Sequence, residues 1–379
     1  IMVIGIDASR ANSRKKTGVE WYAFHVIQGL KKVVNNDVHV VLYSREPLVG
    51  ELAVLPKSWS SRVLSWKPGC LWTQIRLGWE MIRHSPDVLF VPAHVPPLIH
   101  PKKTVTTIHD VAARHFPESY TRFQRWYSLW SARYAACHLW RVIVPSIFTK
   151  KEVLGMVGSK NFGHVSVIPH GYDEGFLHTP DKKIIDTVCQ KYGIKGHYSI
   201  TLGRRETKKN TLAAVKAFET LKQEHPHNAS VAPLQLVLVG KPGFGSKEVD
   251  VAITISPYKE DILCIGWAPQ QDVQVLMHGA SMLVFPSFSE GFGMPLLEAF
   301  AAKTMVIAGS GSSLEEVGGD AVVYIAPQDI PELAQAMYIG LTEEHKRNVL
   351  IQKGLERVRR YSWNICAKET RDVLLHNCC

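Results

Sequence analysis

Two glutamates separated by seven residues follow a short apolar run in the second half of the chain. They lie in residues 286–298, whose sequence is PSFSEGFGMPLLE. Gly291 and Gly293 allow the backbone to approach a ligand closely, and the proline after them favours the first turn of a helix, whose free N–H groups attract an anion. Glu290 is then expected on the loop and Glu298 one turn into the helix, where both carboxylates can accept hydrogen bonds from vicinal hydroxyls. Each glutamate alone also suits a helix cap or a solvated loop, but the combination predicts a sugar-phosphate site.

Four basic residues lie within residues 203–210, GRRETKKN, which also follow an apolar run. Arginine can bind a phosphate through two hydrogen bonds, and lysine supplies a point charge. Both can stabilise a diphosphate that gains negative charge as its bond to a transferred group breaks. The segment precedes a predicted helix at residues 211–221, where positive charge opposes the helix dipole. This position argues against a purely structural purpose and predicts a diphosphate site.

Two segments of the first half are further candidates. Residues 7–19 form a polar, glycine-containing loop between a predicted strand and a predicted helix. His109 and Asp110 end another apolar run. The chain has 17 histidines, so a single one at the end of a strand is commonly structural. Asp110 could orient the imidazole of His109 or begin the next turn.

Short apolar runs alternate with helical patterns through both halves, which predicts parallel sheets with helices on both faces. Ligands bind outside the carboxyl ends of such strands, and the segments above all follow strands. The predicted fold class is α/β, with two doubly wound Rossmann-like domains facing across a cleft. Strands are expected at residues 2–6, 38–43, 87–91, 105–108 and 141–144 of the first half, and at 198–202, 234–239, 262–265, 282–285, 305–308 and 321–325 of the second.

The chain has 379 residues, more than one hydrophobic core commonly holds, so two domains are expected. An apolar run ends at a proline and a glycine within residues 167–173, and a charged, turn-rich stretch then leads to Gly193. The predicted domains are therefore 1–172 and 173–360.

Charge is unevenly distributed between the two halves. Residues 1–172 hold 22 Lys and Arg against 10 Asp and Glu, whereas residues 173–379 hold 22 against 24. A basic surface of this kind can attract nucleic acid, an anionic membrane or an acidic substrate. We find no interleaving of aromatic and basic residues typical of nucleic-acid motifs, so nucleic acid is not the expected partner.

The remaining composition is that of a soluble protein. No apolar run approaches the roughly 18 residues of a membrane-spanning helix, and the N-terminal residues do not resemble a signal peptide. The seven cysteines are scattered, so neither a disulfide framework nor a zinc site is indicated. We expect a cytoplasmic protein, and one with no metal site.

The spacing of Glu290 and Glu298, together with the basic segment, resembles glycosyltransferase family 4, retaining enzymes of the GT-B fold with an E-x7-E motif. The resemblance covers nearly the whole chain. It implies that Glu290 contacts the donor sugar and Glu298 the ribose hydroxyls. The backbone amides of Gly291, Phe292, Gly293 and Met294 would hold sugar and phosphate oxygens.

The basic segment and the first half fit the same family. The family pattern of a Gly-Arg turn followed by Lys-Asn begins here at Gly203 and implies that Arg204 and Lys209 contact the diphosphate, with Arg205 and Lys208 as solvated neighbours. In the first half, Gly18 aligns with the family's first glycine loop, but Glu20 stands where a second glycine is common. His109 aligns with a histidine near the anomeric carbon and the acceptor.

The resemblance implies a hexosyl transfer, of mannosyl or glucosyl type, from a nucleotide-diphosphate sugar to a glycan or lipid-linked acceptor, as in bacterial surface polysaccharide or glycolipid assembly. The nucleotide sugar is a co-substrate, and no cofactor or metal is implied. The first domain would hold the acceptor and could contact an anionic membrane peripherally, and residues 361–379 would cross back to it as a helix. Two alternatives stay open: a nucleotide-sugar epimerase of similar fold, and a non-catalytic nucleotide-sugar-binding homologue.

Overall fold

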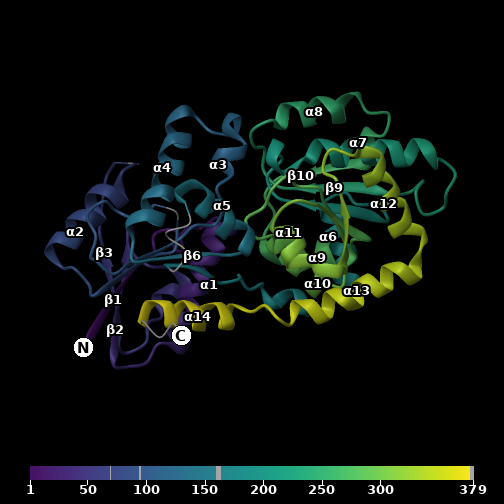
Figure 1. Ribbon diagram of the computed structural model, residues 1–379. Helices are drawn as coiled ribbons and strands as arrows, with labels where there is room; N and C mark the ends of the chain where they lie inside the picture. The colour runs from purple at the N-terminus through teal and green to yellow at the C-terminus, as the bar shows by residue number, and fades with distance from the viewer. Residues whose placement is uncertain (69, 94, 159–163, 376–379) are drawn as a thin grey trace. The chain divides into compact units, whose positions relative to one another are not determined.

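The computed structural model describes residues 1–379 except 69, 94, 159–163 and 376–379. The chain forms two compact units (Figure 1). Unit 1 comprises Ile1–Gly171 together with Tyr361–Cys379, and unit 2 comprises Tyr172–Arg360. The boundary predicted from the sequence lies one residue later, between 172 and 173, and the second predicted boundary lies between 360 and 361.

Unit 1 is built on a parallel sheet whose strand order is β3-β2-β1-β4-β5-β6-β7. Its central strands are largely buried because helices cover both faces, and all of them except Thr104–Thr107 are mainly apolar. The strands are β1 (Met2–Asp7), β2 (Val38–Ser44), β3 (Trp59–Val63), β4 (Val88–Val91), β5 (Thr104–Thr107), β6 (Arg141–Val144) and β7 (Val165–Val167).

The helices of unit 1 include one from the far end of the chain. α14 (Trp363–Leu375) packs on α1 (Gly18–Val33), and their backbones approach so closely that a Cβ atom on Gly29 would lie 2.5 Å from the Cβ of Ala367. The others are α2 (Gly78–Arg83), which continues a π-helical turn η2 (Trp72–Leu77), α3 (Ala112–His115), α4 (Arg122–His138) and α5 (Ile147–Val157).

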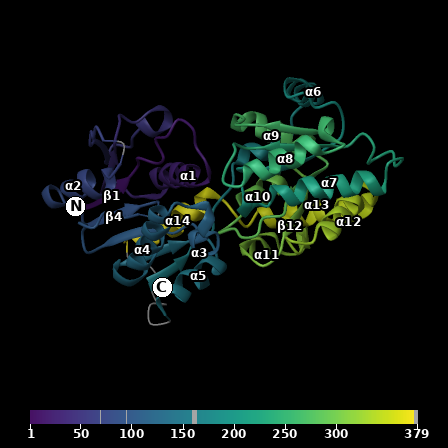
Figure 2. The same ribbon diagram turned by 90° about the horizontal axis from the view of Figure 1, so that it is seen from above.

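Unit 2 has a second parallel sheet, of order β10-β9-β8-β11-β12-β13. Its strands are β8 (Tyr198–Leu202), β9 (Gln235–Val239), β10 (Ile262–Ile265), β11 (Met282–Phe285), β12 (Met305–Gly309) and β13 (Val322–Ile325). The helices are α6 (Lys182–Lys191), α7 (Thr211–Glu224), α8 (Ser246–Ile255), α9 (Gln270–Gly279), α10 (Met294–Ala301), α11 (Ser313–Gly318), α12 (Ile330–Thr342) and α13 (Glu344–Val358). α7 and α12 pack side by side (Figure 2).

The prediction of two doubly wound parallel sheets is confirmed, and each predicted strand is present within two residues. β3 was not predicted, because its residues are mostly polar and it forms an exposed edge of the sheet. No bounds were predicted for β7. The prediction that the stretch before Gly193 is only turn-rich was wrong, because α6 and a short 3-10 segment, η5 (Glu174–Leu177), lie within it. In the described part of the chain, none of the helices is long and apolar enough to cross a bilayer.

Candidate active site

The basic loop of unit 2 lies between β8 and α7, at the carboxyl end of the sheet. Gly203 has a φ of 125°, and the carbonyl of Gly203 lies so near Gly240 that a Cβ atom there would be 1.8 Å from it. Only glycine fits two backbones this close. The loop then turns through a short 3-10 segment, η6 (Thr207–Lys209), into α7.

The ammonium group of Lys209 joins the basic and acidic loops. Its Nζ lies 2.6 Å from Oε1 of Glu290 and 5.1 Å from the ring centre of Phe285. Both side chains of the ion pair are largely shielded from water. The structure thus brings together two of the predicted site residues from segments 81 positions apart in the chain.

A small pocket lies beside this ion pair. Arg204 also borders it, and the Arg204 side chain is 61% exposed, with its Nε 3.8 Å from a carboxylate oxygen of Glu206. This loose contact leaves the guanidinium able to reorient toward a ligand. The pocket is lined by Thr201, Leu202, Gly203, Arg204, Lys209, Thr211, Val284, Phe285 and Pro286.

Asn210 fixes the basic loop to two neighbouring strand ends. Its backbone is left-handed, with φ 54° and ψ 38°, and its side-chain amide donates to the carbonyls of Pro286 at 3.1 Å and Pro327 at 2.5 Å. These carbonyls follow β11 and β13. The amide therefore holds three loops at one edge of the sheet, a role that the sequence reading missed.

The prediction that Arg205 and Lys208 are solvated was wrong. The Arg205 side chain is only 13% exposed, and its Nη1 lies 2.7 Å from the carboxylate of Asp250. Lys208 is buried, and its carbonyl accepts from the N–H of Phe288 at 3.0 Å. The reason is the path of the loop, since Arg205 forms a parallel bridge with Pro242 and turns its side chain toward α8.

The acidic loop after β11 is ordered by a serine that the sequence reading did not single out. The hydroxyl of Ser313, the first residue of α11, contacts the carbonyls of Glu290 at 2.8 Å and Phe292 at 3.0 Å. Glu290, Gly291 and Phe292 are buried. Gly293, with a φ of 104°, is the residue before α10, and a Cβ atom on it would lie 2.5 Å from Leu314.

The predicted helix after this loop is confirmed as α10, which begins at Met294. Glu298 lies one turn into it and is half-buried, and the carboxylate that pairs with Lys209 is that of Glu290. Burial, together with the nearby charge of Asp173, raises the pKa of the Glu298 carboxyl to about 7. Asp173 is itself held by a hydrogen bond from Gln274 at 2.9 Å.

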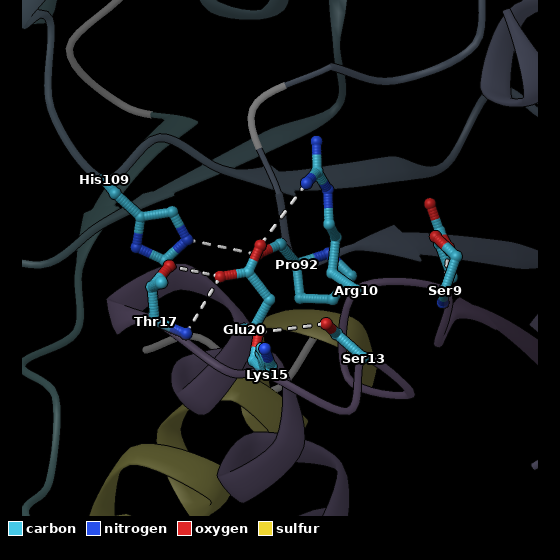
Figure 3. Close-up of polar contacts among 9 residues, drawn as sticks. Ser9, Arg10, Ser13, Lys15, Thr17, Glu20, Pro92 and His109 are labelled. Carbon is cyan, nitrogen blue, oxygen red and sulfur yellow. Dashed lines mark hydrogen bonds and ion pairs between the residues drawn. The ribbon is translucent and has the colours of Figure 1, made fainter. Parts of the chain in front are cut away.

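Gly18 lies in unit 1 as the first residue of α1, directly after Thr17. The Glu20 carboxylate contacts the hydroxyl of Thr17, accepts from its N–H at 3.1 Å, and lies 3.3 Å from Nη1 of Arg10 (Figure 3). The glutamate that replaces the family's second glycine therefore places the protein's own negative charge at the start of α1. A phosphate would meet like charge there.

His109 is buried in unit 1, just after β5. Its Nε2 lies 3.1 Å from the carbonyl oxygen of Pro92 (Figure 3), which accepts when the proton is on Nε2. The ring of Tyr22 packs edge-on at 4.6 Å, and the Tyr22 hydroxyl is 2.9 Å from Thr107. Asp110 accepts from the N–H of Ala112 at 3.1 Å, so it does begin the next turn.

A second histidine lies beside His109. The ring of His170 is 5.3 Å from that of His109, and burial, together with the charge of His109, holds the pKa of His170 well below its usual value. His170 also contacts the ring of Trp363 from α14. Among the residues that the structure describes, no three His, Cys, Asp or Glu side chains could together hold a metal ion.

Two family models match the chain, one in each half. The model for Glycosyltransferase Family 4 matches residues 16–176, and that for Glycosyl transferases group 1 matches residues 188–357. The second match contains both the basic and the acidic loop of unit 2.

Curated relatives include bacterial mannosyltransferases. O-antigen chain mannosyltransferase B of Escherichia coli is 24% identical over 292 residues, which are 77% of this chain and 73% of that protein. O-antigen chain mannosyltransferase RfbU of Salmonella typhimurium is 20% identical over 83% of this chain and 84% of its own length. The serotype-specific mannosyltransferase WbdA of Escherichia coli is 25% identical over 47% of this chain, which spans only 22% of WbdA.

Solved structures share the fold over almost the whole chain. WaaG, a glycosyltransferase involved in lipopolysaccharide biosynthesis, has a TM-score of 0.75 at 15% identity and covers 98% of this chain and 99% of its own. Anabaena HepE, solved with UDP-glucose, has a TM-score of 0.76 at 16% identity over 99% of both chains. The two parallel-sheet units are thus those of the GT-B fold, and the chain belongs to glycosyltransferase family 4.

Proposed function

We propose that the chain transfers a hexosyl group, of mannosyl or glucosyl type, from a nucleotide-diphosphate sugar to a glycan or lipid-linked acceptor, with retention of the anomeric configuration. The observation that carries this proposal is the meeting of the basic and acidic loops of unit 2 at the ion pair of Lys209 and Glu290, 2.6 Å apart beside a small pocket. The names of the relatives, O-antigen mannosyltransferases, support a place in bacterial surface polysaccharide assembly.

The residues of unit 2 would bind the donor. Arg204 and Lys209 compensate the charge of the diphosphate, and the amides of residues 291–294 hold sugar and phosphate oxygens at the start of α10. Glu290 accepts hydrogen bonds from the sugar hydroxyls, and Glu298 from those of the ribose. Because the two cations supply the charge that a divalent ion could supply, we propose that the reaction needs no metal, and no cofactor beyond the co-substrate.

Transfer follows from the same groups. The acceptor oxygen bonds to the anomeric carbon while the bond from that carbon to the leaving phosphate breaks, and the acceptor proton passes to the phosphate on the same face. Removing a fixed group that stabilises charge on the leaving group typically lowers kcat by about 10²–10³. We assign His109 to the side of the site that meets the sugar and the glycosyl acceptor. When its Nε2 donates a hydrogen bond to the Pro92 carbonyl, its Nδ1 can accept a hydrogen bond from a hydroxyl.

The acceptor would be met by unit 1. Residues 1–172 carry the excess of positive charge, 22 Lys and Arg against 10 Asp and Glu, which suits a lipid-diphosphate acceptor or an anionic membrane. We therefore place the protein in the cytoplasm, with peripheral contact to the inner face of the cytoplasmic membrane.

The proposal is tested by donor binding and transfer with matched variants. A thermal-shift screen against UDP-, GDP- and ADP-sugars selects the donor. Transfer from that donor, with EDTA present, is then compared for the wild type, for Lys209→Ala, and for Lys216→Ala, whose exposed lysine lies on α7, the helix that follows the basic loop. We expect Lys209→Ala to lower kcat by about 10²–10³, and Lys216→Ala to match the wild type.

Other outcomes would identify the alternatives. Near-normal activity of Lys209→Ala, or transfer that stops in EDTA, would contradict the assigned site. An epimerised free sugar formed without acceptor would indicate an epimerase, although the relatives compared above are transferases by name. Donor binding without transfer to any acceptor would indicate a non-catalytic homologue.

A further inference from the structure

The helix α4 of unit 1 (Figure 1) carries a continuous row of stacked aromatic rings. Phe123 stacks on Tyr127 at 5.8 Å, Trp126 on Trp130 at 6.0 Å, and Trp130 on Tyr134 at 5.5 Å. The rings at the start of the helix face solvent, since Phe123 is 65% and Trp126 58% exposed. Rings that belong to a hydrophobic core are covered by protein, whereas the rings at the N-terminal end of this row are exposed to solvent.

A second apolar row runs along η2 and α2. Ile75, Trp79 and Ile82 follow helical spacing and are exposed, with Trp79 at 51%. Leu98 and Ile99, from the loop before β5, are exposed beside them. Exposing large apolar side chains to water is unfavourable, so a cluster of them on the surface indicates an interaction site.

Hydrogen bonds join the two rows into one surface. The side-chain amide of Gln74 in η2 donates to the hydroxyl of Tyr127 in α4 at 3.0 Å. The Gln74 carbonyl oxygen accepts from the N–H of Leu98 at 3.0 Å, and His100 contacts the Tyr134 hydroxyl at 2.9 Å. We call this surface, formed by residues 71–83, 95–103 and 122–138, the aromatic-basic face.

The charge of this face is almost entirely positive. Its residues include seven Lys and Arg and one acidic residue, Glu80. Glu80 is buried and paired with Arg62 and Arg76, so it presents little negative charge to a partner. The guanidinium of Arg83 lies 5.1 Å over the ring of Trp79, which places a cation at the edge of an apolar row. The other cations are Lys102, Lys103, Arg122, Arg125 and Arg133.

We propose that the aromatic-basic face docks on an anionic lipid surface, which deepens and rests on the proposed transfer to a lipid-linked acceptor. Trp and Tyr rings suit the boundary between acyl chains and headgroups, while Lys and Arg stems lie on apolar surface and extend their charge to lipid phosphates. Exposed Ile and Leu enter the acyl region, as in amphipathic surface-binding helices.

Other partners fit this face less well. Two copies of the chain would bring like charges together, which opposes self-association. The expectation that aromatic and basic residues do not interleave was wrong for α4, where arginines alternate with aromatic residues. Single-stranded nucleic acid binds such side chains, but it gains little from exposed branched aliphatic residues such as Ile75 and Ile82. The combination of cations with both aromatic and aliphatic side chains favours lipid.

Sedimentation with vesicles tests the face without donor or acceptor. The full chain is mixed with vesicles of phosphatidylglycerol and phosphatidylethanolamine, or of phosphatidylcholine alone. We expect binding to the first only, and its loss in about 0.5 M salt. Arg122→Gln/Arg125→Gln should weaken binding about 25-fold, since each cation near an anionic surface contributes about fivefold. Trp79→Ser/Trp126→Ser should weaken it at least tenfold, as buried apolar area is lost.

Matched controls lie on exposed parts of unit 2. Lys182→Gln/Lys183→Gln removes two exposed cations, and Ile255→Ser removes an exposed apolar side chain, and both should bind as the wild type does. The proposal would be overturned if the wild-type protein did not bind anionic vesicles, or if the variants of this face bound them with wild-type affinity. It would also be overturned by binding of a short single-stranded oligonucleotide, or by a dimer measured by light scattering, that the same substitutions abolish.

Activity on a water-soluble acceptor separates the two proposals. Face variants that lose vesicle binding should keep wild-type transfer to a soluble acceptor. A chain that binds vesicles but transfers nothing would retain this face and lose the proposed function. A chain that transfers sugar normally but does not bind vesicles would support the proposed function and contradict the docking of this face on lipid.

Discussion

The ionisation of Glu298 should control how tightly the donor is bound. Burial, with the charge of Asp173, raises the pKa of this carboxyl to about 7, so the carboxylate form dominates only above neutral pH. A carboxylate accepts hydrogen bonds from ribose hydroxyls more strongly than the neutral acid does. Donor affinity should therefore rise with pH and fall about tenfold between about pH 7.5 and pH 5.5. Calorimetry with the intact nucleotide sugar measures it, because its diphosphate has no proton to lose in this range.

Two comparisons isolate the carboxyl. A donor analogue lacking both ribose hydroxyls should show no such pH dependence. Asp173→Asn removes the neighbouring charge and should move the transition to lower pH. An affinity that stays constant across this range in the wild type would contradict the assignment of Glu298 to the ribose.

The pairing of Lys209 with Glu290 predicts opposite effects on two ligands. Glu290→Gln removes the carboxylate that lies 2.6 Å from the ammonium group, so Lys209 is freer to meet a phosphate. A nucleoside diphosphate without sugar should bind at least about fivefold more tightly, because even an exposed ion pair contributes up to about 1 kcal/mol and this pair is largely shielded from water. The nucleotide sugar should gain nothing, because Glu290 is its hydroxyl partner. Equal gains for both ligands would place Glu290 away from the sugar.

Residue types and spacing predicted the chemistry of these positions but not their surroundings. Lys209 and Glu290 were predicted for one site, and the structure joins them directly. Ser313 and Asn210 were missed because they act on backbone carbonyls of other loops, which no local pattern announces. Arg205 was misplaced in solvent because its partner, Asp250, comes from α8, 45 residues away.

At the scale of the elements, Asn210 should limit the stability of the loops around the pocket. Asn210→Ala places alanine in a left-handed backbone that asparagine tolerates better, which costs up to about 1–2 kcal/mol, and leaves two carbonyls without the amide. We expect the free energy of unfolding to fall by about 2–4 kcal/mol, measured by urea denaturation, and donor affinity to fall as well. Asn210→Gly accepts the left-handed backbone and should lose only the hydrogen-bond share. Equal effects of the two substitutions would show that backbone conformation is unimportant there.

The central elements were readable from sequence because buried parallel strands are continuously apolar. β9 is fully buried and was predicted within one residue. β3 could not be predicted from the sequence, because only one of its five residues is buried. It is an edge strand, with β2 on one side and no strand of the described chain on the other. α6 was missed although Ile184, Ile185, Val188 and Cys189 recur at helical spacing, because its other six residues are polar and none of the ten is fully buried.

At the scale of the whole molecule, the two units should respond to different perturbations. The nucleotide sugar binds residues of unit 2 in our proposal, so a ligand at 100 times its Kd should stabilise unit 2 by about 2.7 kcal/mol. Gly29→Leu forces α1 and α14 apart and should destabilise unit 1 by about 1–3 kcal/mol. Calorimetry should resolve two transitions, one raised by ligand and the other lowered by the substitution.

An exposed site gives the control for this prediction. Lys32→Leu places the same new side chain at an exposed position of α1. It should leave both transitions near those of the wild type. A single transition that moves with either perturbation would mean that the units unfold together.

The return of α14 to unit 1 has a consequence for how the protein is made. During synthesis the ribosome releases residues 1–171 first and then all of unit 2, before α14 exists to cover Gly29 on α1. Unit 2 can fold as a contiguous piece of chain, whereas unit 1 keeps the apolar face of α1 exposed until α14 has been synthesised. Chaperones that bind nascent chains would thus be expected on the earlier half, and their release would coincide with the arrival of the last helix.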